Sequence, residues 1–343
     1  MRYSNLKKLA AVVLSIGMVF SSSAVTGFSA DNSKMIPTIV ESSYSQAAAN
    51  IDDEYAYDGT YVDKWGGDTR KGSQLGVTYT KDATEFNIWA PAATGVKVNI
   101  YEAGAGNASN ACKIGSYTLE KVSSSKEWNG IWTITLLGDW GDLYYDYTIT
   151  TTAAYNKDSN QTQTYNIQDP YSVAVSEDGK YSYITDTSTI SPEGWDNDRH
   201  VYVDSTKANT VYRISVKDFS SDAESGMAAG GKYSAFTQKG AKVNSAGELV
   251  SGIDYLKELG VTTVQLAPFA DYEADSEYEI LNYNAPETSY ASNPSDCKTV
   301  IKECKEMIQA LHSAGFSVVM EMPYTHASEE NSLEKSVPGF FTE

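Results

Sequence analysis

The clearest pattern of apolar and polar residues lies between residues 249 and 268, where an amphipathic stretch is followed by a short apolar run. Four apolar side chains recur there at helical spacing, namely Leu249, Ile253, Leu256 and Leu259. Gly260 follows, where a helix most easily ends in the left-handed conformation. The uncharged run 261–266, in which Gln265 is the one polar exception, then predicts a strand covered on both faces. Helix, turn and buried strand together are typical of a parallel α/β fold.

The same unit is repeated on either side of this stretch. Upstream, residues 211–216 predict a strand. Downstream, residues 293–296 (Asn-Pro-Ser-Asp) form a helix-start signal. The predicted helix carries an apolar stripe of Val300, Cys304, Met307, Ile308 and Leu311. Gly315 ends it and residues 316–320 predict a third strand, so the sequence from 205 onward indicates repeated βα units, as in a barrel whose chemistry lies at the carboxyl ends of its strands.

Residues 75–150 show a different, two-residue period. Val96, Val98 and Ile100 alternate with polar residues, which predicts a strand with one buried face. Similar short runs occur at 76–80, 85–89, 131–136 and 143–149 with turn residues between them. Several short strands at close spacing predict a β-sandwich.

The N-terminus has the pattern of a bacterial-type secretory signal. Arg2, Lys7 and Lys8 precede an apolar run, Leu9–Phe20, and small residues follow it. The apolar run is short for a membrane span, so we expect residues 1–30 to direct secretion without membrane insertion. Residues 31–70 are rich in Ser, Ala, Asn and Asp and are expected to form a linker.

Composition narrows the range of partners and cofactors. The net charge of −19 disfavours nucleic acid and anionic lipid, whereas a neutral ligand carries no such penalty. The 25 tyrosines suit both β-sheets and sugar-binding surfaces. Three cysteines cannot complete a disulfide framework, and the three histidines lack zinc-type spacing. No metal site or cofactor is therefore expected, with calcium left open.

Residues 76–93 resemble the start of a family 48 carbohydrate-binding module, an immunoglobulin-like sandwich that precedes the barrel in α-glucan debranching enzymes. The resemblance is carried by Gly76-Val77-Thr78-Tyr79 and by Phe86-Asn87-Ile88-Trp89-Ala90-Pro91-Ala92-Ala93. We expect Trp89 to pack into the core and Pro91 to end an edge strand. Asp169-Pro170-Tyr171-Ser172 and Ser191-Pro192-Glu193-Gly194-Trp195 resemble the connector to the barrel in such enzymes.

Residues 76–343 as a whole resemble type I pullulanases of glycoside hydrolase family 13. The markers, in chain order, are residues 216–220, 252–261, 282–290 and 337–340. The resemblance implies a sandwich over 71–155, a connector over 156–204, and over 205–343 the first three strands of a (β/α)8 barrel. It also implies hydrolysis of α-1,6 linkages in pullulan or starch with retention, which needs two carboxyls about 5 Å apart.

The resemblance places no catalytic residue in this chain. In the family the acids follow the fourth, fifth and seventh barrel strands, which would lie beyond Glu343. Two substrate-binding residues carry over: Tyr278, at the position whose ring stacks on a sugar, and His326, which in the family contacts a sugar hydroxyl. Glu321 stands where the family has Asp. Arg213 and Ser215 stand where the first strand usually carries Glu and His.

Three functions remain open from the sequence. The first is a secreted pullulanase-type hydrolase, of which this chain would be the N-terminal portion. The second is a non-catalytic α-glucan-binding protein or pseudoenzyme, and the third is an inactive fragment. Because the family's sugar site is eroded, we expect this chain to be inactive alone, with starch or pullulan as its partner. The sequence does not indicate the oligomeric state.

Overall fold

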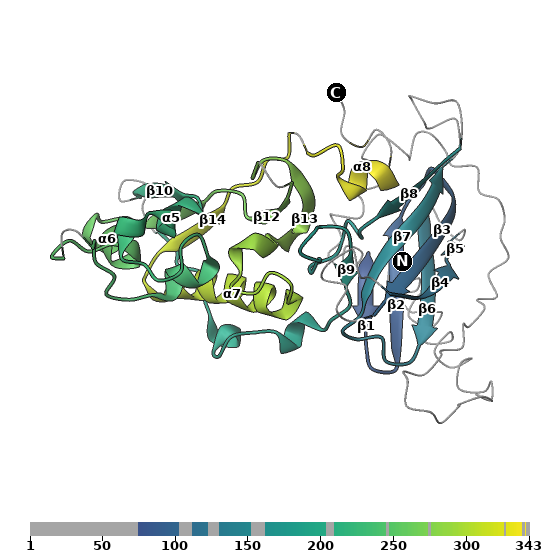
Figure 1. Ribbon diagram of the computed structural model, residues 1–343, viewed down its shortest axis with the longest axis horizontal. Coiled ribbons are helices and arrows are strands. Elements are labelled where there is room, and N and C mark those ends of the chain that lie inside the picture. Colours follow the sequence, from purple (N-terminus) through teal and green to yellow (C-terminus); the bar gives the residue numbers. More distant parts are fainter. Residues whose placement is uncertain are drawn as a thin grey trace, which may run out of the picture.

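The computed structural model describes residues 75–102, 112–122, 130–151, 162–203, 209–244, 247–273, 276–325, 327–337 and 340. The expected signal peptide (1–30) and linker (31–70) lie outside these residues. Figure 1 shows two parts along the long axis of the molecule, a β-sandwich and a mixed α/β part joined by an extended segment.

The N-terminal part is a sandwich of two antiparallel sheets, as the alternating pattern predicts. One sheet has the order β1-β2-β6-β5 and contains Gly76–Tyr79, Ala83–Trp89, Ile131–Leu137 and Glu120–Lys121. The other has the order β4-β3-β7-β8 and contains Lys113–Thr118, Ala93–Tyr101, Tyr144–Thr151 and Gln163–Ile167. Val96, Val98 and Ile100 are fully buried between them, so the alternation in β3 correctly identified its inner face.

Two expectations for the sandwich need correction. Strand β8 pairs with β7, and the short β9 (Ser182–Tyr183) also pairs with β7. The sandwich therefore continues past residue 155 into the segment expected to be a connector. Pro91 does not end an edge strand, because β2 is hydrogen-bonded to β1 on one side and to β6 on the other. Both differences arise from strand pairing, which alternation alone does not determine.

The C-terminal part is built on three parallel strands in the order β10-β11-β14, namely Val211–Ile214, Thr263–Leu266 and Ser317–Met320. Helix α6 (Gly252–Glu258) precedes β11, and α7 (Cys297–Ser313) precedes β14. An antiparallel hairpin of β12 (Ala270–Tyr272) and β13 (Ile280–Pro286) lies between β11 and α7. The short helices are α5 (Asp218–Ser221), α8 (Ser332–Ser336), and the 3-10 turns Thr187–Thr189, Trp195–Asn197, Ala223–Ser225, Tyr233–Thr237 and Thr288–Tyr290.

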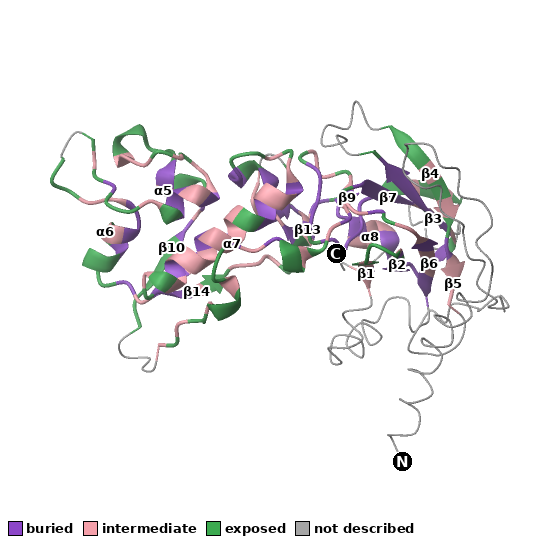
Figure 2. Ribbon diagram, turned by 90° about the horizontal axis from the view of Figure 1, so that it is seen from below, coloured by how far each residue is buried: buried purple, intermediate pink, exposed green. Residues whose placement is uncertain are grey.

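The helix that the sequence predicted most strongly is shorter than its apolar pattern. Ile253 and Leu256 are buried in α6, but Leu249 and Leu259 are 61% and 48% exposed. Gly260 adopts the expected left-handed conformation, with φ of 76°, and ends this helix. Figure 2 shows exposed residues along α6, whose buried residues are Gly252, Ile253 and Leu256.

The two parts meet through segments far apart in sequence. Helix α8 and Phe340 pack against the sandwich in a cluster with Trp89, Ile131 and Val337. The ring centroids of Trp89 and Phe340 lie 6.4 Å apart, edge to face. Trp89 is 3% exposed, so it is buried as expected, although its partners include the C-terminal segment. Across the part of the chain that the structure describes, no helix has the length and apolar character needed to cross a bilayer.

Candidate functional site

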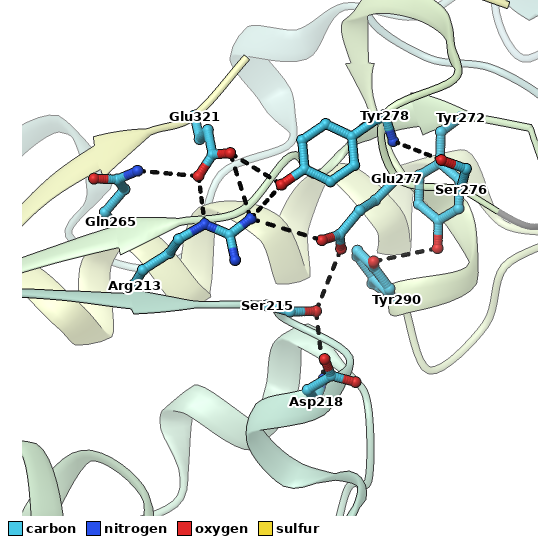
Figure 3. Close-up of polar contacts among 10 residues, drawn as sticks. All are labelled: Arg213, Ser215, Asp218, Gln265, Tyr272, Ser276, Glu277, Tyr278, Tyr290 and Glu321. Carbon is cyan, nitrogen blue, oxygen red and sulfur yellow. Dashed lines mark hydrogen bonds and ion pairs between the residues drawn. The ribbon is translucent and has the colours of Figure 1, made fainter. Parts of the chain in front are cut away.

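Polar side chains gather at the carboxyl ends of the three parallel strands. Arg213 of β10 lies beside Gln265 of β11 in register, and Glu321 directly follows β14. Tyr278 reaches them from the hairpin loop between β12 and β13. Because parallel strands end at one edge of the sheet, these four residues come together; we call them the strand-end cluster (Figure 3).

An ion pair between Arg213 and Glu321 holds the cluster together. Arg213 Nε lies 2.7 Å from Glu321 Oε2, and its Nη2 lies 3.3 Å from Glu321 Oε1. Gln265 Nε2 donates to Glu321 Oε2 at 3.0 Å. This paired contact lowers the pKa of Glu321, with Arg213 as the largest cause. Glu321 therefore reaches across β11 to β10, so one side chain links all three strands.

Tyr278 is held by both members of this ion pair. Its hydroxyl accepts a hydrogen bond from Arg213 Nη2 and donates one to Glu321 Oε1 at 3.1 Å. Burial, followed by the hydrogen bond to Glu321, raises the pKa of Tyr278. The structure thus places Tyr278 at the strand ends with its hydroxyl hydrogen-bonded to protein side chains. His326 lies outside the described residues, so its contact with sugar stays a prediction.

A second carboxylate, Glu277, lies on the other side of Arg213. Its Oε1 is 4.0 Å from Arg213 Nη2, and its Oε2 accepts a hydrogen bond from Ser215 Oγ at 3.3 Å (Figure 3). Burial raises the pKa of Glu277, whereas that of Glu321 is lowered. Opposite shifts are typical of an acid and base pair. Here, however, the guanidinium of Arg213 contacts both carboxylates, whereas retaining hydrolysis needs the space between its two carboxyls to be open.

Sequence reasoning found the members of this cluster but not their pairing. The sequence marks Arg213, Ser215 and Glu321 only as departures from the family pattern, and it does not single out Glu277. Charge complementarity is the feature of the sequence that could have predicted the ion pair of Arg213 with Glu321. The resemblance implies an acid where Arg213 stands on the first strand and an Asp where Glu321 stands after the third, and the longer Glu321 contacts Arg213.

A second polar site lies between the two parts of the molecule. It is a cavity of about 640 Å³, lined by residues of both parts that include Asp146, Gln168, Glu177, Asp178, Asp271, Glu273 and Glu287. Asp271 is only 3% exposed, and its Oδ2 accepts a hydrogen bond from Gln168 Nε2 at 3.2 Å. Burial, with a smaller contribution from Glu287, raises its pKa to about 8.

Several acids line this cavity, and Glu277 and Glu321 lie at the strand ends. Within the described residues, no group of three or more His, Cys, Asp or Glu side chains is arranged to hold a metal ion. Gln168 Oε1 instead accepts a hydrogen bond from Asn282 Nδ2 at 3.2 Å, so the lining of the cavity joins the sandwich to the hairpin. The polar side chains at this boundary serve to connect the two parts.

Two family models match separate parts of the chain. Residues 74–172 match carbohydrate-binding module 48 (isoamylase N-terminal domain), and residues 236–338 match the alpha amylase catalytic domain. The first range covers the sandwich together with β8. The second begins in the turn before α6 and includes β11, the hairpin, α7, β14 and α8.

Individual relatives give the same result. The chain is 32% identical over 305 residues to a pullulanase of Bacillus subtilis, covering 85% of this chain and 37% of that protein. It is 26% identical to the chloroplastic pullulanase 1 of Arabidopsis thaliana, covering 94% of this chain and 35% of that protein. Among solved structures, the pullulanase of Bacillus acidopullulyticus matches with 34% identity and a TM-score of 0.67, covering 78% of this chain and 32% of that one.

The structure of a Paenibacillus barengoltzii pullulanase matches with 29% identity and a TM-score of 0.69, covering 83% of this chain and 44% of that one. The chain therefore spans about a third of the length of the curated relatives it matches. It shares with them a β-sandwich module followed by an amylase-type α/β part. By sequence and by fold, it belongs to the type I pullulanases of glycoside hydrolase family 13 that carry a family 48 module.

Proposed function

We propose that this chain is an α-glucan-directed protein whose own residues bind the glucan without hydrolysing it. The matching Paenibacillus barengoltzii pullulanase was solved in complex with maltohexaose and α-cyclodextrin, which supports the ligand class. The net charge of −19 also favours a neutral polymer such as starch or pullulan over an anionic one.

The ion pair of the strand-end cluster carries the proposal that binding occurs without hydrolysis. Retaining hydrolysis needs one free carboxylate to attack the anomeric carbon and one protonated carboxyl to assist the leaving group. Glu321 is paired with Arg213 at 2.7 Å, and Tyr278 and Gln265 donate hydrogen bonds to it as well. These hydrogen bonds occupy its oxygens and reduce its nucleophilicity.

Hydrolysis by Glu277 and Glu321 is the second candidate, and one observation favours it. The pKa of Glu277 is raised and that of Glu321 is lowered, as a general acid and a nucleophile require. Substrate binding would have to displace Arg213 from both carboxylates for this pair to act. The two candidates therefore differ in whether purified protein releases reducing ends.

Two measurements on the purified full chain separate these candidates. Retardation in a native gel containing pullulan, compared with a gel without polysaccharide, tests binding. Incubation with pullulan, with reducing ends counted against a heat-denatured control, tests hydrolysis. We expect retardation without release of reducing ends. Turnover that disappears in both Glu277→Gln and Glu321→Gln would instead establish the second candidate, and absence of retardation would refute binding.

We also propose that the protein is secreted. The proposal is supported by the basic residues Arg2, Lys7 and Lys8 ahead of the apolar run Leu9–Phe20. Fusion of residues 1–35 to a reporter enzyme should direct the reporter out of a bacterial cell. A variant with Leu14→Arg in the apolar run should retain it in the cell, and equal export of both fusions would contradict the proposal.

A further inference from the structure

We propose that Tyr324 and Tyr283 form a stacking platform for a glucose unit of an α-glucan, beside the strand-end cluster. The proposal deepens the binding function proposed above and rests on it. The rings of the two tyrosines are stacked, with centroids 5.7 Å apart and planes 21° apart. Tyr324 is 75% exposed, while Tyr283 is half-buried beneath it.

The stacked geometry leaves one broad apolar surface open to solvent. Tyr283 covers part of one face of the Tyr324 ring, because the two rings are offset, and the opposite face of Tyr324 is left open. Among the described residues, the other tyrosine that is mostly exposed is Tyr202, at 86%. Tyr202 meets His200 edge to face at 87°, and no parallel ring from the described part of the chain stacks on it. Of these two tyrosines, Tyr324 is the one that combines high exposure with a supporting ring.

The backbone and a hydrogen bond hold this platform in place. Tyr324 N donates to Met322 O at 3.1 Å, which closes a tight turn around Pro323. The hydroxyl of Tyr283 donates to Pro323 O at 3.3 Å, so the lower ring is tied to the same turn. Proline limits the motion of this turn. A preorganised ring loses little conformational entropy when a ligand binds to it.

Position and chemistry indicate a sugar as the ligand. Tyr324 is three residues beyond Glu321, which limits their Cα separation to about 11 Å. Tyr283 follows Tyr278 on the hairpin, so the platform comes from the same two segments that contribute Glu321 and Tyr278 to the cluster. The apolar C–H face of a pyranose fits an aromatic ring, while its hydroxyls suit nearby polar groups. A short α-glucan can thus contact the platform and the cluster together.

The test compares three variants of the full chain in native gels containing pullulan. Tyr324→Ala removes the ring, and we expect it to raise the apparent dissociation constant at least about fivefold. Tyr324→Phe keeps the ring and should be retarded like the unmodified protein. Tyr202→Ala is the matched control, because it removes a comparably exposed tyrosine without a stacked partner, and it should also be retarded normally.

The outcomes distinguish the platform from the proposed binding function. If the unmodified protein is retarded and Tyr324→Ala is retarded equally, the platform is refuted and glucan binding stands. If the unmodified protein is not retarded, both the platform and the proposed glucan binding are refuted. A second measurement needs no variant: nitration of Tyr324 by tetranitromethane, mapped by mass spectrometry, should fall severalfold in saturating maltohexaose. Nitration of Tyr202 should not change, and equal nitration of Tyr324 with and without the sugar would refute the platform.

Discussion

Replacing Asp271 with Asn should make the stability of the protein less dependent on pH. Asp271 lies at the boundary between the two parts, 3% exposed, and its pKa is raised to about 8 mainly by burial. Glu287 and Asp178 add to the shift, and the hydrogen bond from Gln168 opposes it. Asparagine has nearly the same shape and can accept the same hydrogen bond, but it has no proton to lose.

The direction of the effect follows from proton binding in the two states. In the unfolded chain Asp271 loses its proton near the ordinary aspartate pKa of 3.8, whereas the folded protein keeps it up to about pH 8. Between these values the folded state binds more protons, so stability falls as pH rises. The slope is about 1.4 kcal/mol per pH unit, and over the roughly four units between the two pKa values the whole effect is about 6 kcal/mol.

The assay is urea unfolding followed by tryptophan fluorescence at pH 6.5, 7.0 and 7.5. This window lies above the pKa of the buried neighbour Asp169, which is raised to about 6 by burial. The free energy of unfolding of the unmodified protein should fall across the window more steeply than that of Asp271→Asn, by roughly 1 kcal/mol. Asp82→Asn, at an exposed position, controls for the loss of one negative charge. Equal slopes for the unmodified protein and Asp271→Asn would refute the reasoning.

Three further changes test packing and the strand-end cluster. In a double-mutant cycle, Arg213→Ala and Glu321→Ala should show a coupling of about 0.5–1 kcal/mol that weakens in salt. A coupling of zero at low salt would show that this ion pair does not contribute to stability. Leu256→Ala should cost about 2–5 kcal/mol in urea unfolding, whereas Leu259→Ala, at a position 48% exposed, should cost far less; equal costs would contradict the short α6. Gly226→Ala should lower the melting temperature much more than Gly240→Ala, and equal shifts would argue against the close approach of Lys242 to Gly226. Both glycines have positive φ, but an added Cβ would lie 1.8 Å from Lys242 O at the first position and meet nothing within 4 Å at the second.

The regular elements were predictable because local patterns determine them. Helix α7 illustrates this, since Asp296 caps it as the sequence predicted, accepting a hydrogen bond from Lys298 N. Gly315 ends the segment with φ of 93°, again as expected. Helix capping and left-handed glycines depend on neighbours within a few residues, which a sequence shows directly.

Contacts between distant segments were not predictable in the same way. Leu249 and Leu259 fit a helical stripe but are exposed, because burial depends on what packs against a helix rather than on periodicity. The sequence analysis identified no strand at residues 163–167, and the pairing of β8 with β7 depends on contacts between separate segments. For the site, the sequence identified Tyr278 and the unusual Arg213 and Glu321, whereas their mutual contacts depend on the register of three strands.

The contact of Trp89 with Phe340 bears on how the protein is made. About 250 residues separate the two rings, and during synthesis the sandwich strands emerge from the ribosome long before Phe340 does. Until then Phe340 cannot cover the indole of Trp89, and closing such a long loop is slow. The nascent chain therefore passes through a stage at which this apolar surface is accessible to chaperones and proteases, and that stage ends only when α8 docks on the sandwich.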